Sequence, residues 1–291
     1  MTVYLSIDIG GTYIKYAFIN DGHELFGHQK IKTNENVDNA IRKQVEEIID
    51  SASDVFTIKG VGISTAGIVD RERGKIIYAG PTIQDYAGTD FKSQLSRKFG
   101  LPIHVENDVN AALLGERWKG AAQGEDHVFC ITLGTGIGGA YFHQQLVDGF
   151  HHQANSVGYL LYDEKTNTNY ESRAATSALN RVIEQEVGKG IEAKEVFDRA
   201  KSGDKKCMAI IHSWASEVAK GLAQIIILID PKCILIGGGI SRQGEFLLKL
   251  VQEHVVQFLP KNFLITELKI AELFNDAALY GAVYPFFKEE L

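Results

Sequence analysis

Residues 2–19 read TVYLSIDIGGTYIKYAFI, and this stretch predicts the unit from which the fold is built. Two segments rich in β-branched and aromatic residues, Thr2–Ile7 and Tyr13–Ile19, predict strands. Asp8 and the pair Gly10-Gly11 lie between them, a composition typical of a tight turn. The stretch therefore predicts a hairpin whose turn carries one carboxylate and a glycine-rich backbone.

The second half of the chain repeats this arrangement. Val128–Leu133 predicts a strand, GTGIGG at 134–139 predicts a glycine-rich turn, and Ala140–Phe142 predicts the returning strand. Another buried strand, Cys233–Ile236, ends in three glycines at 237–239. The recurrence predicts two α/β units related by internal duplication, with a cleft between them.

Helical patterns separate the predicted strands. Apolar residues recur at helical spacing over 37–49, 174–187 and 206–228. Strands that alternate with helices indicate an α/β fold with a mixed sheet. No low-complexity linker separates the halves, and we expect the second unit to begin near Gly115.

The composition is that of a folded globular protein. Of the 291 residues, 45% are hydrophobic and 23% are charged, which excludes a disordered chain. The net charge of −7 weighs against a nucleic-acid partner. Asp8 interrupts the apolar start, so no secretory signal is indicated. The longest apolar run, Leu222–Ile229, is shorter than the ~20 residues of a membrane span. We therefore expect a cytoplasmic protein with no membrane association.

Three glycine-rich turns that follow buried strands favour a phosphate-bearing ligand. Successive backbone N–H groups in such turns form a concavity that binds anions, and glycine lets a ligand approach closely. Each turn alone would also fit an ordinary hairpin. The pattern GxxxxGK[ST] is missing, which excludes a P-loop site. The turn at 134–139 leads into a strand and not into a helix, so it is not a dinucleotide-binding fingerprint.

Glu106, Asn107 and Asp108 lie between a predicted strand, Ile103–Val105, and a predicted helix, Val109–Trp118. Asn and Asp are favoured at helix N-termini, where they cap backbone N–H groups. A carboxylate at such a junction can also serve as a general base. The residues alone leave both interpretations open.

Four motifs, in this order, resemble those of the ROK family of sugar kinases, which belongs to the hexokinase and actin-like ATPase superfamily. They are DIGGT at 8–12, ENDVNAA at 106–112, LGTGIGG at 133–139 and LIGGGI at 235–240. The resemblance implies two ribonuclease-H-like α/β domains with an interdomain cleft. It places one domain over residues 1–114 and the other over 115–275, with a last helix at 276–291 that packs back on the first domain. It also implies a homodimer.

The resemblance implies that the chain uses ATP and Mg²⁺. Asp8 would hold the hydration shell of the magnesium ion, and Thr135 would lie near the γ-phosphate. Lys15 is either a phosphate contact or a solvent-facing strand residue. Further nucleotide contacts are implied for Gly10, Gly11, Thr12, Gly134, Gly136, Gly237, Gly238 and Gly239.

The resemblance also implies transfer of the γ-phosphate to the 6-hydroxyl of a sugar. Asp108 would be the general base, Asn107 would bind a sugar hydroxyl, and Gly67 would let the backbone approach the sugar ring. Glu171 matches the last acidic residue of the family's zinc motif and is expected to contact the sugar. The segment 86–91 corresponds either to a family segment near the sugar or to an ordinary loop.

The chain departs from the family in one region. Ser156 and Tyr159 stand where most members have Glu and His, and the cysteines of the family's zinc motif are missing from residues 159–171. We therefore expect no zinc site, because zinc needs several Cys or His ligands. The adjacent His151 and His152 would point to opposite faces of a strand, which disfavours a metal site there. Three cysteines lie far apart elsewhere, at Cys130, Cys207 and Cys233, and indicate neither a disulfide framework nor a zinc cluster.

Ser156 and Tyr159 favour a β-glucoside substrate, because the Glu and His that they replace bind hydroxyls on the anomeric side of the sugar. A plain glucokinase, an N-acylhexosamine kinase and a non-catalytic sugar-binding protein remain as alternatives. A sugar-responsive repressor is disfavoured, since its DNA-binding helices would have to precede a motif that starts at Asp8.

Overall fold

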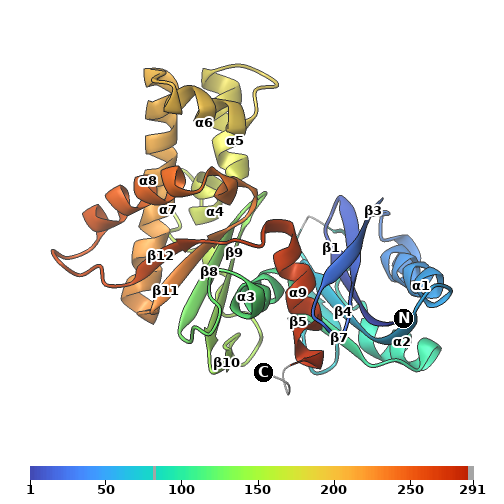
Figure 1. The fold of residues 1–291 in the computed structure, drawn as a ribbon. Coiled ribbons are helices and arrows are strands. Elements are labelled where there is room, and N and C mark those ends of the chain that lie inside the picture. Colours follow the sequence, from blue (N-terminus) through green and yellow to red (C-terminus); the bar gives the residue numbers. More distant parts are fainter. Residues whose placement is uncertain (81–82, 288–291) are drawn as a thin grey trace. The chain divides into compact units, whose positions relative to one another are not determined.

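The computed structural model describes residues 1–80 and 83–287 and confirms the α/β fold. Its contacts divide the chain into two units (Figure 1). Unit 1 comprises residues 1–123, 149–153 and 275–287, and unit 2 comprises residues 124–148 and 154–274. The final helix therefore belongs to unit 1, and the last four residues of the expected segment 276–291 lie outside the described residues.

Unit 1 contains a five-stranded mixed sheet. Its strands are β1 (Thr2–Ile9), β2 (Tyr13–Ile19), β3 (Leu25–Lys32), β4 (Thr57–Thr65) and β7 (Ile103–Asn107). They follow the order β3-β2-β1-β4-β7, with β1 to β3 antiparallel and β4 and β7 parallel to β1. A separate hairpin consists of β5 (Ile68–Asp70) and β6 (Lys75–Tyr78).

Unit 2 repeats this topology. Its strands are β8 (Val128–Leu133), β9 (Ile137–His143), β10 (Gln145–Leu146), β11 (Cys233–Gly237) and β12 (Glu267–Ile270). Their order is β10-β9-β8-β11-β12, with β8 to β10 antiparallel and β8, β11 and β12 parallel. Both sheets thus contain a hairpin followed by two parallel strands, the repeat that the glycine-rich turns predicted.

Helices cover both sheets. Unit 1 has α1 (Ala40–Ser53), α2 (Phe91–Phe99), α3 (Asp108–Lys119) and α9 (Ala277–Val283). Unit 2 has α4 (Tyr170–Ala174), α5 (Thr176–Glu186), α6 (Ala193–Lys201), α7 (Lys205–Ile229) and α8 (Glu245–Val255). Single 3₁₀ turns occur at Val37–Asn39, Val157–Tyr159, Gly239–Gln243, Val256–Phe258, Phe274–Asp276 and Tyr284–Phe286. No helix of the described residues is long and apolar enough to cross a membrane.

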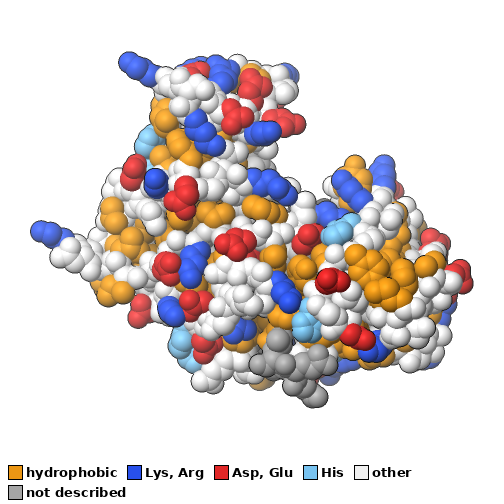
Figure 2. Space-filling model, in the orientation of Figure 1, with side chains coloured by type: hydrophobic (Ala, Val, Ile, Leu, Met, Phe, Trp, Pro, Cys, Tyr) orange, Lys and Arg blue, Asp and Glu red, His pale blue; other side chains and the backbone are white. Residues whose placement is uncertain are grey.

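Local sequence explains where individual elements begin and end. The Asp90 side chain accepts the N–H of Ser93 and caps α2, and Gly100 ends that helix in the left-handed conformation, with φ of 68°. In β1 the alternate residues Val3, Leu5 and Ile7 are fully buried, whereas all of β11 is buried, as expected of a central parallel strand. On the face shown in Figure 2, acidic and basic side chains are interspersed.

Helix α9 packs tightly on the rest of unit 1. A side chain at Gly281 would collide with the carbonyl of Ala111 on α3, and one at Gly115 would collide with the carbonyl of Ala277. The Ser6 hydroxyl on β1 donates a hydrogen bond of 2.6 Å to the carbonyl of Leu279. Small residues thus let the last helix lie against α3 and the first strand.

The structure differs from the sequence-based expectations in some elements. The β5–β6 hairpin and α6 were not predicted. Both are short, so the hydrophobic period along them spans too few residues to be distinctive.

Candidate active site

The carboxyl ends of three parallel strands bring polar residues into one row. Asp8 on β1 lies opposite Ser64 on β4, and Ser64 lies opposite Glu106 on β7. Lys15 on the antiparallel β2 lies opposite Asp8. Ligands of open α/β sheets bind at this carboxyl edge. The register thus explains why residues far apart in sequence form one cluster.

Asp8 is a largely buried carboxylate that is only partly compensated. Its Oδ1 accepts a hydrogen bond of 2.9 Å from Ser64 Oγ, and its Oδ2 lies 3.8 Å from Lys15 Nζ. Burial raises the pKa of Asp8, and Lys15 and Ser64 offset part of that effect. A desolvated carboxylate without a close ion pair is suited to binding a cation.

Asn107 connects β7 to α3. Its Oδ1 accepts the backbone N–H groups of Val109 (2.9 Å) and Asn110 (3.2 Å), so Asn107 caps the helix. Its Nδ2 donates to the carbonyl of Gly67 (2.8 Å) and to Asp108 Oδ1 (2.9 Å). Asn107 therefore positions Asp108, and its expected contact with a sugar hydroxyl stays a prediction.

Asp108 is the first residue of α3. Its Oδ1 also accepts the N–H of Val109 at 3.0 Å. Burial, and then the negative charge of Asp8, raise the pKa of Asp108 to about 6, although the bonds from Val109 and Asn107 lower it in part. A carboxyl group with a pKa near neutrality is well suited to general base catalysis. The cap interpretation thus holds for Asn107, and the assignment of Asp108 as the general base stays a prediction.

Glu106 is a structural partner that the sequence did not single out for a role. It is 7% exposed, and its Oε1 accepts hydrogen bonds of 2.9 Å from both Asn107 N and Asn110 Nδ2. Its Oε2 lies 3.7 Å from Arg71 Nε. Glu106 thus fixes the backbone of the junction beneath Asp108. The sequence pointed to Glu106 only as the first of three consecutive polar residues between a strand and a helix. Nothing in that run distinguished the role of Glu106 from those of its two neighbours.

A buried tyrosine supports the same strand ends. The hydroxyl of Tyr86 lies 2.6 Å from Thr65 Oγ1, and Thr65 is in register with Asn107. Burial raises the pKa of Tyr86, so the phenol stays neutral. The segment 86–91 is a loop that leads into α2, and its correspondence to the family segment near the sugar stays a prediction.

Contacts within the chain partly fix the conformation of Gly67 and of the first glycine-rich turn. Gly67 has φ of +100°, and a side chain there would lie 2.6 Å from the Tyr78 carbonyl. The Gly10 N–H donates to Tyr13 O at 3.0 Å, and Thr33 Oγ1 donates to Gly10 O at 2.7 Å. The ligand contacts expected for Gly10, Gly11, Thr12 and Gly67 stay predictions.

In unit 2, the turn between β8 and β9 is attached to the N-terminus of α5. Ser177 donates from Oγ to the Thr135 carbonyl (2.6 Å) and from its backbone N–H to the Gly134 carbonyl (3.3 Å). Thr176 Oγ1 donates to the Leu133 carbonyl at 2.9 Å. A helix N-terminus carries partial positive charge and favours an anion. The first turn of α5 thus holds the glycine-rich turn in place, and the anion site predicted from the glycines stays a prediction.

A groove of about 760 Å³ adjoins this turn. Two predicted nucleotide motifs meet in it, because Gly134 and Thr135 line it together with Gly239. Its other lining residues are Leu133, Thr176, Ser177, Asn180, Glu184, Gly190, Ile191, Glu192, Ala193, Lys194, Ile240 and Gln243. The volume is in the range of small-molecule sites. Gly238, with φ of +90°, lies against the Leu133 backbone and is required as glycine by the fold.

Glu171 contacts the same turn from α4. Its Oε2 accepts the Ile137 N–H at 2.7 Å, and a side chain at Gly136 would collide with it. Glu171 therefore holds the end of the turn, a role that sequence reasoning did not foresee. Its expected contact with a sugar stays a prediction.

Ser156 and Tyr159 lie at a 3₁₀ turn, where the Tyr159 N–H donates to the Ser156 carbonyl at 3.2 Å. The Tyr159 side chain is 64% exposed. The loop that follows is held by Arg173, which donates to the carbonyls of Leu161 (2.6 Å) and Thr168 (3.1 Å) and pairs with Glu217 at 3.2 Å. A guanidinium thus ties together the stretch in which the zinc motif of related proteins would lie.

Comparison with known proteins shows the family. The sequence pattern of the ROK family matches residues 4–289. The chain belongs to the ROK family. It is 31% identical to a β-glucoside kinase of Klebsiella pneumoniae, over 97% of this chain and 95% of that protein. It is 29% identical to a glucokinase of Thermotoga maritima, over 96% and 95%. A solved ROK family glucokinase from Streptomyces griseus, in complex with glucose and AMPPNP, has a TM-score of 0.84 and 29% identity, over 96% of this chain and 97% of the other.

These matches make the chain a ROK sugar kinase with the actin-like two-domain fold that the motifs implied. The match spans both units, so the family assignment applies to the whole described chain.

Proposed function

We propose that this ROK kinase transfers the γ-phosphate of ATP to the 6-hydroxyl of a hexose or β-glucoside, with Asp108 as the general base. The observation that carries the proposal is the state of Asp108: burial and Asp8 raise its pKa to about 6, and Asn107 fixes its orientation. The glucose and AMPPNP held by the Streptomyces griseus relative support the substrate classes.

Asp108 would accept the proton of the attacking hydroxyl. At pH 7 a carboxyl group with this pKa is mostly ionised, yet it is basic enough to share the proton as the new bond forms. Asn107 keeps Oδ1 oriented, so the proton is directed to the remaining electron pairs of the carboxylate. This arrangement needs no further side chain to activate the hydroxyl.

The nucleotide would lie in the groove lined by Gly134, Thr135 and Gly239. Backbone N–H groups of the turn and the N-terminus of α5 would favour the phosphate anion. Asp8 fits the magnesium ion that such kinases use, because it is a desolvated carboxylate without a close ion pair. When bound, that ion supplies positive charge opposite the phosphoryl group.

A β-glucoside is the favoured acceptor. Serine at 156 is smaller than the glutamate typical of the family and leaves room at the anomeric carbon. The exposed ring of Tyr159 could stack on a second sugar. The similarity to the Klebsiella β-glucoside kinase supports this choice, and the similarity to the Thermotoga glucokinase supports glucose as the second candidate. We also propose that the protein is a homodimer and acts in the cytoplasm.

A coupled assay of ADP formation tests the function. We expect cellobiose or an aryl β-glucoside to reach a kcat/KM at least equal to that of glucose. Glucose ahead of every β-glucoside by two orders of magnitude would make the chain a plain glucokinase, and N-acetylmannosamine ahead of both would make it an N-acylhexosamine kinase. No turnover of any hexose, despite sugar binding by calorimetry, would leave a non-catalytic binding protein. Light scattering on the eluted protein tests the dimer.

A further inference from the structure

A cluster of two histidines and an aspartate lies at the open end of the β8–β9 hairpin in unit 2. His127 immediately precedes β8 and His143 is the last residue of β9, next to the strand pair Val128 and Phe142. Asp126 adjoins His127 in the chain. This cluster is separate from the glycine turn, which joins the same two strands at their other end.

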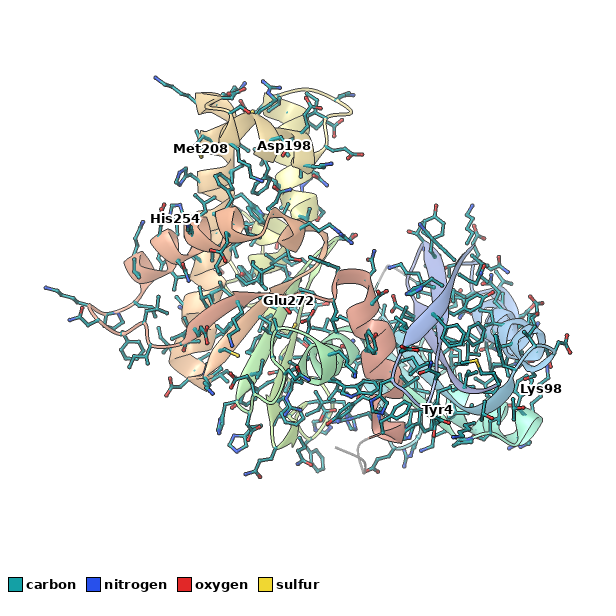
Figure 3. All side chains as sticks on the ribbon, in the orientation of Figure 1. Tyr4, Lys98, Asp198, Met208, His254 and Glu272 are labelled. Atoms are coloured by element: carbon teal, nitrogen blue, oxygen red, sulfur yellow. The ribbon has the colours of Figure 1, made fainter. Side chains whose placement is uncertain are left out.

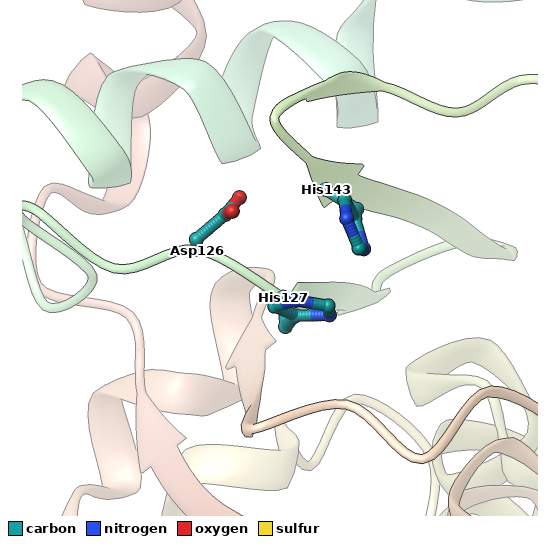
Figure 4. Close-up of side chains that lie close together, drawn as sticks. All are labelled: Asp126, His127 and His143. Carbon is teal, nitrogen blue, oxygen red and sulfur yellow. The ribbon is translucent and has the colours of Figure 1, made fainter.

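The three side chains converge (Figure 4). The imidazole centroids of His127 and His143 are 3.8 Å apart, and one potential ligand atom from each of the three residues lies within 4.8 Å of the others. In a tetrahedral zinc site with bonds of about 2.0–2.1 Å, ligand atoms lie roughly 3.4 Å apart. Small rotations of partly exposed side chains bridge this difference.

The backbone around the cluster is fixed. His127 and Gln144 both adopt the left-handed conformation, with φ of 58° and 59°. Asp126 Oδ1 accepts the Gln144 N–H at 2.7 Å, and the His127 carbonyl accepts the Lys232 N–H at 2.8 Å. Because non-glycine residues rarely adopt this conformation, it persists only where the surroundings impose it. The three side chains are therefore held near one another by the fold.

We propose that Asp126, His127 and His143 bind a divalent transition-metal ion, with Zn²⁺ as the cognate ion. Two imidazoles and one carboxylate are donors that suit Zn²⁺ and its neighbours Co²⁺ and Ni²⁺, whereas Mg²⁺ prefers oxygen ligands alone. Three protein ligands leave at least one position for water, so the ion exchanges with solvent. The proposal is independent of the phosphoryl-transfer function.

Bound zinc would join the two strands at the end opposite the turn Leu133–Ile137. Six residues of β8 separate the cluster from that turn, roughly 20 Å of strand. We therefore expect zinc to raise the thermal stability of the protein.

A second histidine pair provides a matched control. His212 Nδ1 and His254 Nε2 lie 3.1 Å apart on α7 and α8, where Figure 3 labels His254. No third Cys, Asp or Glu ligand was found beside that pair among the described residues. His212→Gln thus removes a histidine of similar kind from outside the proposed site.

Calorimetric titration of ZnCl₂ into tag-free protein that has been dialysed against EDTA tests the site. We expect one ion per chain and a rise in Tm of about 5 °C at saturating zinc. His143→Gln and His127→Asn should each weaken binding at least about tenfold, and asparagine tolerates the left-handed conformation at 127. Their circular dichroism without zinc should match that of the parent protein, and His212→Gln should bind zinc as the parent does.

Co²⁺ provides a spectroscopic probe of the same ligands. The parent protein should develop visible d–d absorption that His143→Gln lacks. Zinc binding that is absent at 100 µM, unchanged in both His127→Asn and His143→Gln, or lost in His212→Gln would overturn the proposal. If His127→Asn does not fold, His143→Gln alone decides, because position 143 has no left-handed backbone to preserve.

Discussion

The surroundings of Asp108 have two opposing effects on its protonation. Its Oδ1 accepts hydrogen bonds from Asn107 and Val109, which favour the ionised form, yet burial and the charge of Asp8 favour the protonated form. Since the latter effects are larger, the pKa of Asp108 is raised. A carboxylate kept basic in this way destabilises the folded protein at neutral pH.

Asp108→Asn tests both consequences. An amide keeps the size of the side chain and can still accept from Val109 N–H, but it cannot take a proton, so kcat should fall about 10²–10⁴-fold. Steady-state assays with saturating ATP and sugar measure this loss. Turnover near the parent value would contradict the assignment of the base.

The same variant should be more stable than the parent at pH 8. Because the folded-state pKa of Asp108 lies above its ordinary value, its contribution is favourable below about pH 4 and is lost as the pH rises through about 6. Asparagine does not titrate and removes this penalty. Thermal unfolding at pH 8 and at pH 5 should show a larger gain in Tm at pH 8, and equal Tm differences at both would argue against a raised pKa.

The pH profile of the parent enzyme provides an independent measure. The base acts in its ionised form, so kcat/KM should fall toward acid with an apparent pKa near 6. Sugar and ATP are kept below their KM values, with a buffer series of constant ionic strength. An acid limb near 4 would show that the carboxylate is not perturbed in the free enzyme.

Tyr159 carries the prediction on the substrate. If its ring stacks on the second sugar of a β-glucoside, Tyr159→Ala should lose about 0.5–1.5 kcal/mol of transition-state binding for cellobiose, or roughly 2- to 13-fold in kcat/KM. Glucose, which has no second ring, should lose less. Tyr159→Phe is the matched control, since it keeps the ring, and it should retain the preference.

At the scale of elements, the turn between β8 and β9 depends on side chains from α4 and α5. Glu171 accepts the Ile137 N–H, and Ser177 binds the carbonyl of Thr135. Neither contact is encoded in the turn itself. The glycines allow the turn, and the two helices fix one conformation of it.

Glu171→Ala should therefore disturb nucleotide binding. The buried N–H of Ile137 would lose its partner at a cost of about 1–3 kcal/mol, which raises the KM for ATP on the order of tenfold. Glu171→Gln keeps an acceptor oxygen for the Ile137 N–H, so its KM for ATP should be close to that of the parent protein. A rise in the KM for sugar in both variants, with the KM for ATP unchanged, would instead favour the sugar contact implied by the family.

Individual elements show which features of the fold and of the candidate site could be predicted from the sequence. Strands such as Tyr13–Ile19 and Val128–Leu133 were predicted with their observed bounds, because their apolar character and the adjoining glycines are local signals. The groove could not be predicted in full, since Asn180, Lys194 and Gln243 meet only through tertiary packing. Local sequence likewise gave no sign that Glu106 and Tyr86 support the strand ends.

The reasons why individual positions in the glycine-rich turns are glycine could be predicted only in part. Among the glycines of the glycine-rich turns, only Gly238 adopts a positive φ in the described structure. A side chain at Gly136 would displace the Glu171 carboxylate, whereas Gly239 has open space where a side chain would be. Open space at Gly239, on the wall of the groove, is consistent with a ligand that approaches the backbone there.

At the scale of the whole molecule, the zinc content distinguishes a tightly bound structural zinc, which is not expected, from the exchangeable zinc proposed above. The stretch 159–171 contains no Cys or His, and Arg173 holds its loop, so no tightly bound structural zinc is expected. Elemental analysis after EDTA dialysis should find far less than one zinc per chain, while activity should still require added Mg²⁺. One zinc retained per chain, or full activity in EDTA, would contradict the respective half of this prediction.

The glycine contacts between α3 and α9 also govern how the protein is made. Unit 1 contains residues 1–123 but lacks α9 until residues 277–283 have been made. At ~5–20 residues per second, roughly 10–30 s pass between synthesis of α3 and of α9. During that interval the surface that α9 will cover on α3 and β1 is exposed, whereas nearly all of unit 2 is contiguous and can fold as it emerges. The second unit in the sequence is thus the first that can be completed, and we expect the N-terminal unit to finish folding only after α9 has been made.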